Sequence, residues 1–278
     1  MREHSTKLAL LRCLADGEFH SGEFLGEMIG VSRAAISKHI KGIQEWGLDI
    51  YRVQGKGYKL ASRLEMLDQG RLSAVSRDAS LELIPIIGST NQHLLERTND
   101  LESGSVCIAE YQAAGRGRRG REWVSPFGAN LYLSMYWRLD AGMAAAMGLS
   151  LVVGVAVVEA LEEMGVEGVK LKWPNDLYHN DKKLAGILVE LSGQSGGAAH
   201  IVIGLGLNLS MDPTTSGIGQ PWTSLKEVCD GQVPDRNQLA QALINAWDKS
   251  LVDYELTGMS NFVERWNRLD NFLSLIHI

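Results

Sequence analysis

The most unusual stretch of this sequence is a run in which arginine and glycine alternate. Residues 115–121 read Gly-Arg-Gly-Arg-Arg-Gly-Arg. Clustered guanidinium groups repel one another unless an anion lies among them, and their planar forks suit phosphate oxygens. Glycine lets the backbone approach a ligand closely. The run therefore indicates a phosphate-binding loop, with a nucleic-acid-binding loop or a solvated basic turn as alternatives. It lacks the Gly-Lys-Ser/Thr ending of a Walker loop.

Two lysines and an aspartate follow this run at positions that suit charge-stabilising chemistry. Lys172 opens the sequence Lys-Trp-Pro-Asn-Asp, which ends at Asp176, and Lys183 opens an apolar strand, where most lysines are surface residues. A carboxylate becomes a good acyl donor once it is joined to the α-phosphate of ATP. To form that bond, the carboxylate must attack the α-phosphate. The attack brings two anions together and needs cations at the developing charge. The arginine run and these lysines would meet the need, with Asp176 able to help hold Mg²⁺.

Polar and glycine positions elsewhere point to the same region. Ser89, Thr90 and Asn91 follow an expected strand at residues 83–87, where a helix N-terminus would expose amide groups beside three polar side chains. A plain helix cap is the simpler interpretation of these residues. Glycines in an expected strand at residues 200–210 indicate close approach of a ligand or another backbone.

The elements that must position these residues alternate between short strands and helices. We expect strands at residues 106–111, 130–137, 169–173 and 184–191, and helices at 145–164, 237–256 and 260–269. Several hairpin-linked strands with helices on one side predict an α+β fold with a mixed sheet rather than a parallel doubly wound one.

The first sixty residues carry a different pattern. Leucines at helical spacing predict a first helix that ends at Asp16-Gly17, and Ser21 and Ser32 are expected to cap two more. Two short strands joined by residues 54–57 complete a winged helix-turn-helix. A small helical protein-interaction domain is the alternative.

The distribution of charge favours a DNA reader over that alternative. The whole chain has a net charge of −6, yet residues 30–63 carry 7 basic and 2 acidic side chains. A basic patch at one end of an acidic protein suggests a polyanion partner for that end. The candidate DNA contacts are Ser32, Arg33, Ser37, Lys38, Lys41 and Lys56.

Three scattered cysteines and the absence of a signal-peptide pattern predict a cytoplasmic protein. Cys13, Cys107 and Cys229 form no CxxC pair, so neither a disulfide framework nor a zinc site is indicated. The most apolar stretch, residues 147–158, is too short to span a bilayer.

Four runs of this sequence, in their order, resemble those of biotin–protein ligases. They are Ser-Thr-Asn at 89–91, the arginine run at 115–121, Lys-Trp-Pro-Asn-Asp at 172–176 and Lys-Leu-Ala-Gly-Ile-Leu at 183–188. With the winged helix in front, residues 8–271 resemble bacterial bifunctional biotin ligases and biotin operon repressors. The resemblance implies a DNA-binding domain at 1–63 and, after a linker with a connecting helix at 64–82, a class II synthetase-like catalytic domain at 83–271.

The resemblance also implies an activity and its partners. Such an enzyme uses ATP and Mg²⁺ to convert biotin to biotinyl-5′-AMP. It then transfers biotin to a lysine of the biotin carboxyl carrier protein of acetyl-CoA carboxylase. The adenylate is also the corepressor, and the adenylate-bound homodimer binds operator DNA and represses the biotin operon.

Residue roles are implied by the matching motifs. Biotin would be bound by Ser89, Thr90, Asn91, Gln112, Arg116, Gly117, Arg118 and Lys183. The adenylate and its phosphate would be bound by Arg118, Arg119, Arg121, Asn175, Asn208 and Trp222, the last in an ordering loop at 211–222. The catalytic set would be Lys183, Arg118, Lys172 and Asp176, and Asp176 is the candidate Mg²⁺ ligand.

One departure from the family and two rival functions remain at this point. The family's C-terminal SH3-like barrel is expected to be missing, and residues 272–278 are expected to be a truncated or aberrant end. A lipoate or octanoyl ligase would share the catalytic fold. A metabolite-sensing repressor would bind biotin without nucleotide chemistry.

Overall fold

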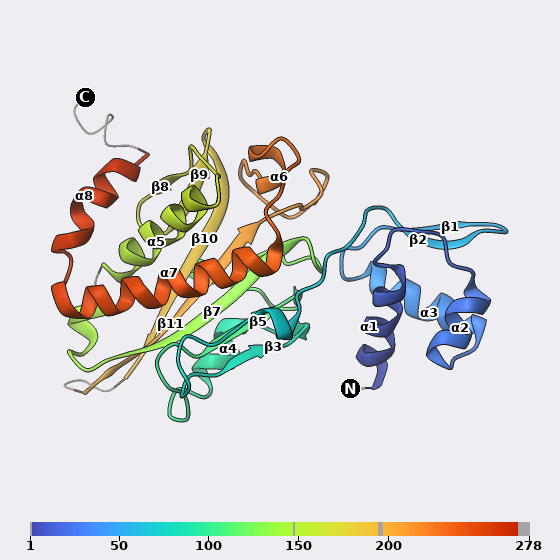
Figure 1. The fold of residues 1–278 in the computed structure, drawn as a ribbon, viewed down its shortest axis with the longest axis horizontal. Helices are drawn as coiled ribbons and strands as arrows, with labels where there is room; N and C mark the ends of the chain where they lie inside the picture. The colour runs from blue at the N-terminus through green and yellow to red at the C-terminus, as the bar shows by residue number, and fades with distance from the viewer. Residues whose placement is uncertain (1, 147, 194–196, 272–278) are drawn as a thin grey trace. The chain divides into compact units, whose positions relative to one another are not determined.

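The chain divides into two compact units in the computed structural model, which describes residues 2–146, 148–193 and 197–271 (Figure 1). Residues up to 66, with 126–128, make the first unit, and residues 67–125 with those from 129 onward make the second. The predicted domain boundaries at residues 63 and 83 stay predictions. The predicted aberrant end at 272–278 lies outside the described residues.

The first unit contains the expected three helices and one hairpin. They are α1 (Arg2–Leu14), α2 (Gly22–Ile29), α3 (Arg33–Gln44), β1 (Ile50–Val53) and β2 (Gly57–Leu60), and the two strands are antiparallel. Ser21 Oγ accepts a hydrogen bond from Phe24 N at 3.1 Å, and Ser32 Oγ accepts one from Ala35 N at 3.2 Å. Both serines therefore begin their helices as the sequence predicted.

One face of α3 belongs to the core of this unit and the other face is open. Ile36, Ile40 and Ile43 recur at helical spacing and are buried. Lys38 and Lys41 lie on the opposite side and are exposed. The amphipathic pattern thus fixes the direction in which the helix presents its charges.

The second unit is built on a mixed sheet of seven strands in the order β3-β5-β7-β11-β10-β9-β8. The β3–β5 pair is parallel and the other neighbouring pairs are antiparallel. The strands are β3 (Leu81–Leu83), β5 (Val106–Ala109), β7 (Asn130–Leu139), β8 (Lys170–Lys172), β9 (Asp176–His179), β10 (Lys182–Ser192) and β11 (Ala199–Asn208). This arrangement confirms the α+β class with a mixed sheet.

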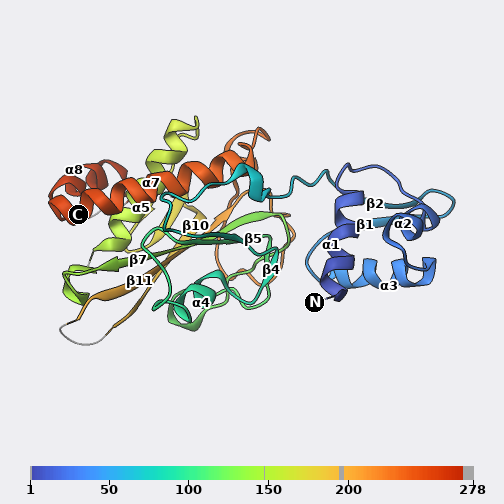
Figure 2. The same cartoon turned by 60° about the horizontal axis from the view of Figure 1, so that its bottom comes forward.

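Three helices cover one face of this sheet, as Figures 1 and 2 show. They are α5 (Leu149–Glu163), α7 (Arg236–Thr257) and α8 (Ser260–Leu269). Alternate residues of the central strands, such as Leu133, Ile187 and Leu205, belong to the apolar core on this side. The segment Met143–Glu163 is long and apolar enough to cross a membrane, but 65% of its most apolar window is buried within the unit. It is therefore the core helix of this layer.

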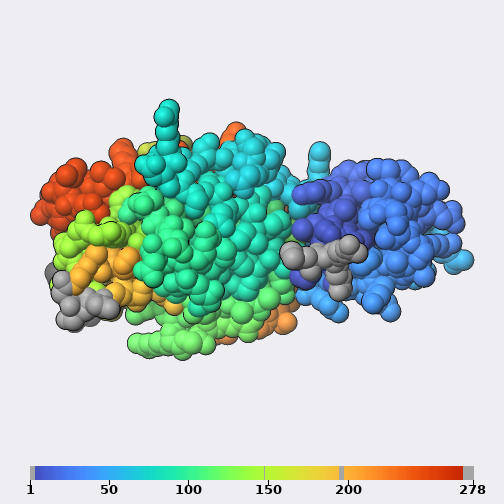
Figure 3. All heavy atoms as spheres, turned by 90° about the horizontal axis from the view of Figure 1, so that it is seen from below, coloured from blue at the N-terminus to red at the C-terminus, as the bar shows by residue number. Residues whose placement is uncertain are grey.

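The opposite face carries α4 (Thr90–Leu95) at one end and is otherwise open. Leu94 packs with Cys107, Tyr136 and Val202 in a small cluster, which seats α4 on the sheet. Figure 3 views this side of the unit, where the segment around α4 (teal) covers the surface. Burial raises the pKa of the Cys107 thiol to about 12, so it stays protonated. The candidate site lies on this face.

Two sequence-based expectations need correction. The single strand expected at 83–87 is divided into β3 and β4 (Ile86–Ile87), because Pro85 lacks the N–H that a continuous ladder requires. Instead, the Pro85 carbonyl accepts from Tyr111 N, next to the parallel pair that β4 forms with β6 (Tyr111–Gln112). The linker at 64–82, all of it described, contains a 3₁₀ turn at Gln69–Arg71 and not a connecting helix.

Candidate functional site

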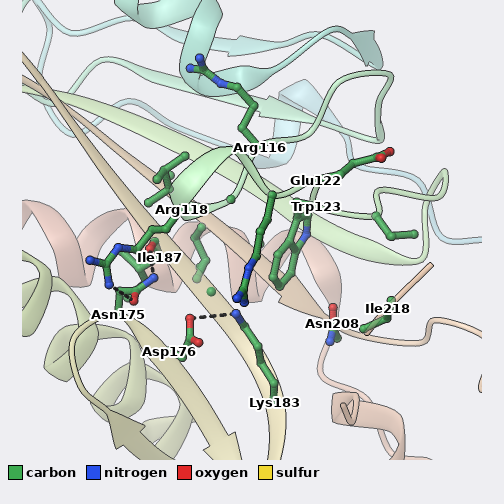
Figure 4. Close-up of a pocket in the computed structure, with 18 of the residues that line it drawn as sticks. Arg116, Arg118, Glu122, Trp123, Asn175, Asp176, Lys183, Ile187, Asn208 and Ile218 are labelled. Atoms are coloured by element: carbon green, nitrogen blue, oxygen red, sulfur yellow. Dashed lines mark hydrogen bonds and ion pairs between the residues drawn. The ribbon is translucent and has the colours of Figure 1, made fainter. Parts of the chain in front are cut away.

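A cavity of about 630 Å³ lies on the open face of the sheet. The N-terminus of α4, the arginine run, β10, β11 and the loop at 211–222 contribute its walls (Figure 4). The predicted site residues that line it are Ser89, Thr90, Asn91, Gln112, Arg116, Gly117, Arg118, Arg119, Arg121, Asn175, Asp176, Lys183, Asn208 and Trp222.

Glycines on paired strands form the floor of the cavity. In the antiparallel register Gly186 lies opposite Gly206, and Leu188 lies opposite Gly204. A Cβ added at Gly204 would come within 2.1 Å of Asn91 Oδ1, and one at Gly206 within 2.3 Å of the Trp123 ring. The sequence predicted that a ligand or another backbone approaches these glycines, whereas in the structure the approaching groups are the side chains of Asn91 and Trp123.

A buried polar network forms one end of the cavity. Gln112 Oε1 accepts from Thr90 N at 2.9 Å, and Gln112 Nε2 donates to Ser125 Oγ at 3.2 Å. Ser134 Oγ, on β7, lies 2.5 Å from Asn91 Oδ1 and 2.7 Å from Thr90 Oγ1. These groups are oriented before any ligand arrives, so they can offer fixed donors and acceptors to a polar ring.

Ser89 and Asn91 complete this end from α4. Ser89 is buried and its Oγ accepts from Gln92 N at 3.4 Å, so it caps the helix and also lines the cavity. Asn91 Nδ2 donates to Leu188 O at 3.3 Å and to Glu190 Oε2 at 2.9 Å. The capping and the binding interpretations of these residues are therefore compatible.

An ion pair marks the other end. Lys183 Nζ lies 2.9 Å from Asp176 Oδ1, and the two side chains are only 13% and 22% exposed (Figure 4). The same ammonium lies over the Trp123 ring, 5.3 Å from its centroid. Backbone hydrogen bonds of Lys183 with Pro221 and Thr223 hold the end of the 211–222 loop beside it. This cation is thus fixed in position next to a carboxylate.

Asn208 and Trp222 also belong to that end. Asn208 Nδ2 donates to Thr223 O at 3.0 Å, and Trp222 forms an isolated bridge with Lys183. The predicted adenine loop at 211–222 therefore ends beside Lys183.

The arginine run forms a closed loop across the cavity. Its base is joined by a hydrogen bond from Trp123 N to Gly115 O at 2.9 Å, and Arg119 at its tip has a left-handed φ of 58°. Arg118 Nη1 donates to Asn175 Oδ1 at 2.7 Å, whereas Arg116 Nη2 contacts Glu190 Oε2 at 2.8 Å. The loop is therefore attached at two separate places.

Lys172 is the predicted catalytic residue that the structure does not bring to this cavity. Its ammonium lies 4.6 Å from the centroid of the Tyr178 ring, and its side chain lines a small neighbouring notch. A role for Lys172 stays a prediction, and no chemical step is assigned to it below.

Three cavity-side residues were not identified from the sequence. Trp123 covers Gly186 and Gly206, Ser134 joins the polar network, and Glu190 contacts Asn91 and Arg116. Ser134 and Glu190 are polar residues with apolar neighbours on both sides in their strands, and Trp123 lies two residues after the arginine run. Those interruptions were the available signal.

The described residues contain no group of three or more His, Cys, Asp or Glu that could hold a metal by themselves. Asp176 is one of two carboxylates that line the cavity, with the exposed Glu122 as the other. Mg²⁺ commonly takes one or two protein carboxylates and completes its shell with phosphate oxygens and water. The residues fit a metal that arrives with a nucleotide, not a resident one.

The predicted nucleic-acid contacts of the first unit are mostly on its surface. Arg33 is 70% exposed and lies 3.5 Å from Glu23, and Lys38 and Lys41 are exposed. Lys56 lies 5.7 Å from the centroid of the Phe19 ring. Ser32 uses its hydroxyl as the helix cap and Ser37 is half-buried, so these two are less available to a ligand than the four basic residues.

Comparisons with known proteins agree with both units. The model of the biotin/lipoate A/B protein ligase family matches residues 83–208, and a helix-turn-helix domain model matches residues 6–59. The Bifunctional ligase/repressor BirA of Salmonella typhimurium is 52% identical, with 98% of this chain and 85% of that protein covered. The protein of the same name from Escherichia coli is 51% identical, with 99% and 85% covered.

Solved structures are similar as well. The biotin protein ligase from Aquifex aeolicus in complex with biotin and ATP is 29% identical, with a TM-score of 0.61, and the match covers 70% of this chain and 79% of that one. The biotin protein ligase from Leishmania major in complex with biotinyl-5-AMP is 25% identical, with a TM-score of 0.55 and coverage of 69% and 81%.

Proposed function

This chain belongs to the family of bifunctional biotin ligase/repressor proteins, and from that premise we propose that it converts biotin and ATP to biotinyl-5′-AMP. It then transfers biotin to a lysine of the biotin carboxyl carrier protein of acetyl-CoA carboxylase. The observation that carries the proposal is a single cavity with a preformed polar network at one end and Lys183 beside Asp176 at the other.

The polar end suits the ureido ring of biotin. That ring has N–H donors and a carbonyl acceptor, and Ser89, Thr90, Asn91 and Gln112 offer hydroxyl and carboxamide groups around it. The glycine floor and the Trp123 ring supply apolar surface for the remainder of the bicyclic group. A site built to hydrogen-bond the polar atoms of one ligand discriminates strongly against ligands that lack those polar atoms.

The cationic end suits the formation of the adenylate. A biotin carboxylate oxygen attacks the α-phosphorus of ATP, the bond to the bridging oxygen breaks, and pyrophosphate leaves with the electron pair. Lys183 would bind the carboxylate or the linking phosphate and offset the repulsion between the two anions. Mg²⁺ would arrive with the triphosphate and neutralise part of its charge, with Asp176 as its candidate ligand.

The arginine loop suits retention of the product of that step. Arg118, Arg119 and Arg121 line the cavity and would lie around the linking phosphate. The acceptor lysine then attacks the acyl carbon, an amide forms, and AMP leaves. Asn175, Asn208 and Trp222 are assigned to the nucleotide part of the adenylate, the last through the loop at 211–222.

The first unit supports a second activity. We infer that Arg33, Lys38, Lys41 and Lys56 contact operator DNA, with the exposed helix cap Ser32 and the half-buried Ser37 beside them. The adenylate would be the corepressor, and the homodimer that it stabilises would repress the biotin operon. A cytoplasmic location follows from these partners.

Biotin-dependent exchange of labelled pyrophosphate into ATP tests the ligase proposal. We expect exchange with biotin but not with lipoate, followed by label on the carrier-protein lysine. Equal exchange with lipoate would favour the lipoate ligase alternative. Binding of biotin without any exchange would favour the non-catalytic repressor.

A further inference from the structure

Glu190 is a half-buried acidic residue at the end of the cavity floor, and the function proposed above gives it no role. Along β10 it follows Gly186 and Leu188 at alternate positions, so its side chain is on the same face of the sheet. Its partner across the ladder is Val202 on β11, and its side chain is 26% exposed. An unassigned carboxylate therefore adjoins the polar network.

One oxygen of this carboxylate contacts two different elements. Glu190 Oε2 accepts from Asn91 Nδ2 at 2.9 Å and from Arg116 Nη2 at 2.8 Å. Asn91 belongs to α4, and Arg116 lies at the start of the arginine loop. Glu190 thus joins the sheet, the helix and the loop at a single atom.

The contact with Asn91 determines which way its carboxamide faces. An ionised carboxylate can only accept hydrogen bonds, so the NH₂ group of Asn91 must face Glu190. That leaves Asn91 Oδ1 beside the Ser134 hydroxyl and Gly204. Together with Leu188 O, which accepts from the same Asn91 Nδ2 at 3.3 Å, Glu190 therefore fixes the polarity of a group that the proposed function places against the biotin ring.

The contact between Glu190 and Arg116 holds the N-terminal segment of the arginine loop. Arg118 holds the tip through Asn175, and in Figure 4 the Arg116 side chain extends away from the Lys183–Asp176 pair, whereas Arg118 reaches toward Asn175. The loop lies across the cavity between these two side-chain attachments. Without the Arg116 contact, Arg118 alone ties its side chains to the cavity wall, while the backbone hydrogen bond from Trp123 N to Gly115 O still closes its base.

We propose that Glu190 is a positioning residue of the biotin site, which orients Asn91 and anchors the arginine loop over the ligand through Arg116. The inference rests on the proposed function for its ligand. Its geometric part, the anchoring of the loop, concerns the ligand-free protein as well.

A double-mutant cycle tests the proposal. We expect Glu190→Gln, which keeps an oxygen acceptor for Asn91, and Arg116→Gln each to raise the dissociation rate of biotin about three- to tenfold. Because each removes the same ion pair, the double variant should dissociate little faster than either single variant. Glu190→Ala, which removes the shorter of the two acceptors of Asn91 Nδ2 as well as the partner of Arg116, should have the largest effect. Glu167→Gln, an exposed acid distant in sequence, is the matched control.

Limited trypsin digestion of the ligand-free variants provides the second measurement. We expect faster cleavage after Arg119 in both single variants than in Glu167→Gln, at equal thermal midpoints. Unchanged dissociation and cleavage, or rate increases that multiply in the double variant, would overturn the proposal. If the unmodified protein fails to bind biotin, the proposed function fails, and the cleavage rates still decide whether Glu190 anchors the loop.

Discussion

The cavity and the basic face of α3 use polar side chains in opposite ways. In the cavity, Asn91, Gln112 and Lys183 are already engaged with protein partners at hydrogen-bond or ion-pair distance. On α3, Lys38 and Lys41 are exposed to solvent. The cavity therefore has hydrogen-bonding groups whose directions are fixed before a ligand binds. The basic face of α3 mainly contributes positive charge.

The difference follows from what each region is proposed to recognise. A small ring with few polar atoms is distinguished only by groups that are held in place, because misplaced groups lose both affinity and reactivity. A phosphate backbone is a periodic line of charge, and cations that adjust to it contribute most of the affinity. Single substitutions should therefore have large effects in the cavity and small, salt-dependent effects on α3.

The largest effect is expected at Lys183. Lys183→Ala removes the cation nearest the reacting end and leaves Asp176 without its 2.9 Å partner. Loss of one charge-stabilising contact of this kind typically lowers the rate about 10²–10³-fold. Biotin-dependent pyrophosphate exchange measures it, with the exposed Lys249→Ala on α7 as control. Exchange at the unmodified rate in Lys183→Ala would remove this residue from the proposed mechanism.

The next effect is expected at the cavity floor. Gly204→Ala places a Cβ within 2.1 Å of Asn91 Oδ1, which is held by Ser134 and cannot move freely. Overpacking of this kind costs about 1–3 kcal/mol, and a loss of that size in binding free energy corresponds to roughly 5–150-fold weaker biotin binding. Calorimetry with biotin measures it. Gly88→Ala, where nothing lies within 4 Å of the added atom, is the matched glycine control. Equal affinities in these two variants would contradict the role given to Asn91.

Sequence patterns predicted local features well and tertiary partners poorly. Ser21 and Ser32 were identified as caps because capping is decided within four residues, and Ile36 was assigned to the core by helical spacing. Lys172 and Lys183 lie at an end of their strands, and nothing in the spacing distinguishes the one that faces the cavity. That outcome depends on strand register.

The same limit explains the residues that were missed. Glu190 and Trp123 acquire their roles from segments distant in sequence, namely Asn91 on α4 and the paired glycines of β10 and β11. The strand expected at 83–87 is interrupted at Pro85. The proline was a local signal against a continuous strand, but the prediction followed the apolar pattern instead. The expected absence of a C-terminal barrel is not tested by the described residues and stays a prediction.

A smaller effect is expected on α3. Lys38→Ala and Lys41→Ala each remove an exposed cation from a surface where no fixed geometry is lost. Each should weaken binding to biotin operator DNA modestly, and each lost phosphate contact should reduce the slope of log affinity against log salt by about 0.9. Biotin affinity should stay unchanged. A slope equal to that of the unmodified protein would mean that α3 does not face the phosphates.

The smallest effect is expected at the tip of the hairpin. Lys56 belongs to the turn between β1 and β2, and its ammonium lies 5.7 Å from the Phe19 ring. Lys59 lies over the same ring at 5.5 Å, so Lys56→Ala leaves a neighbouring cation in place. We therefore expect DNA affinity to fall about twofold, less than for Lys38→Ala, with the salt slope reduced by at most about 0.9. Titrations of operator DNA at several salt concentrations measure both quantities.

The double variant Lys56→Ala/Lys59→Ala separates two explanations for so small an effect. Its loss of DNA affinity should exceed the product of the two single losses, because each lysine compensates for loss of the other. Strictly multiplicative effects would show that the two lysines act independently and that the hairpin contributes as separate point charges.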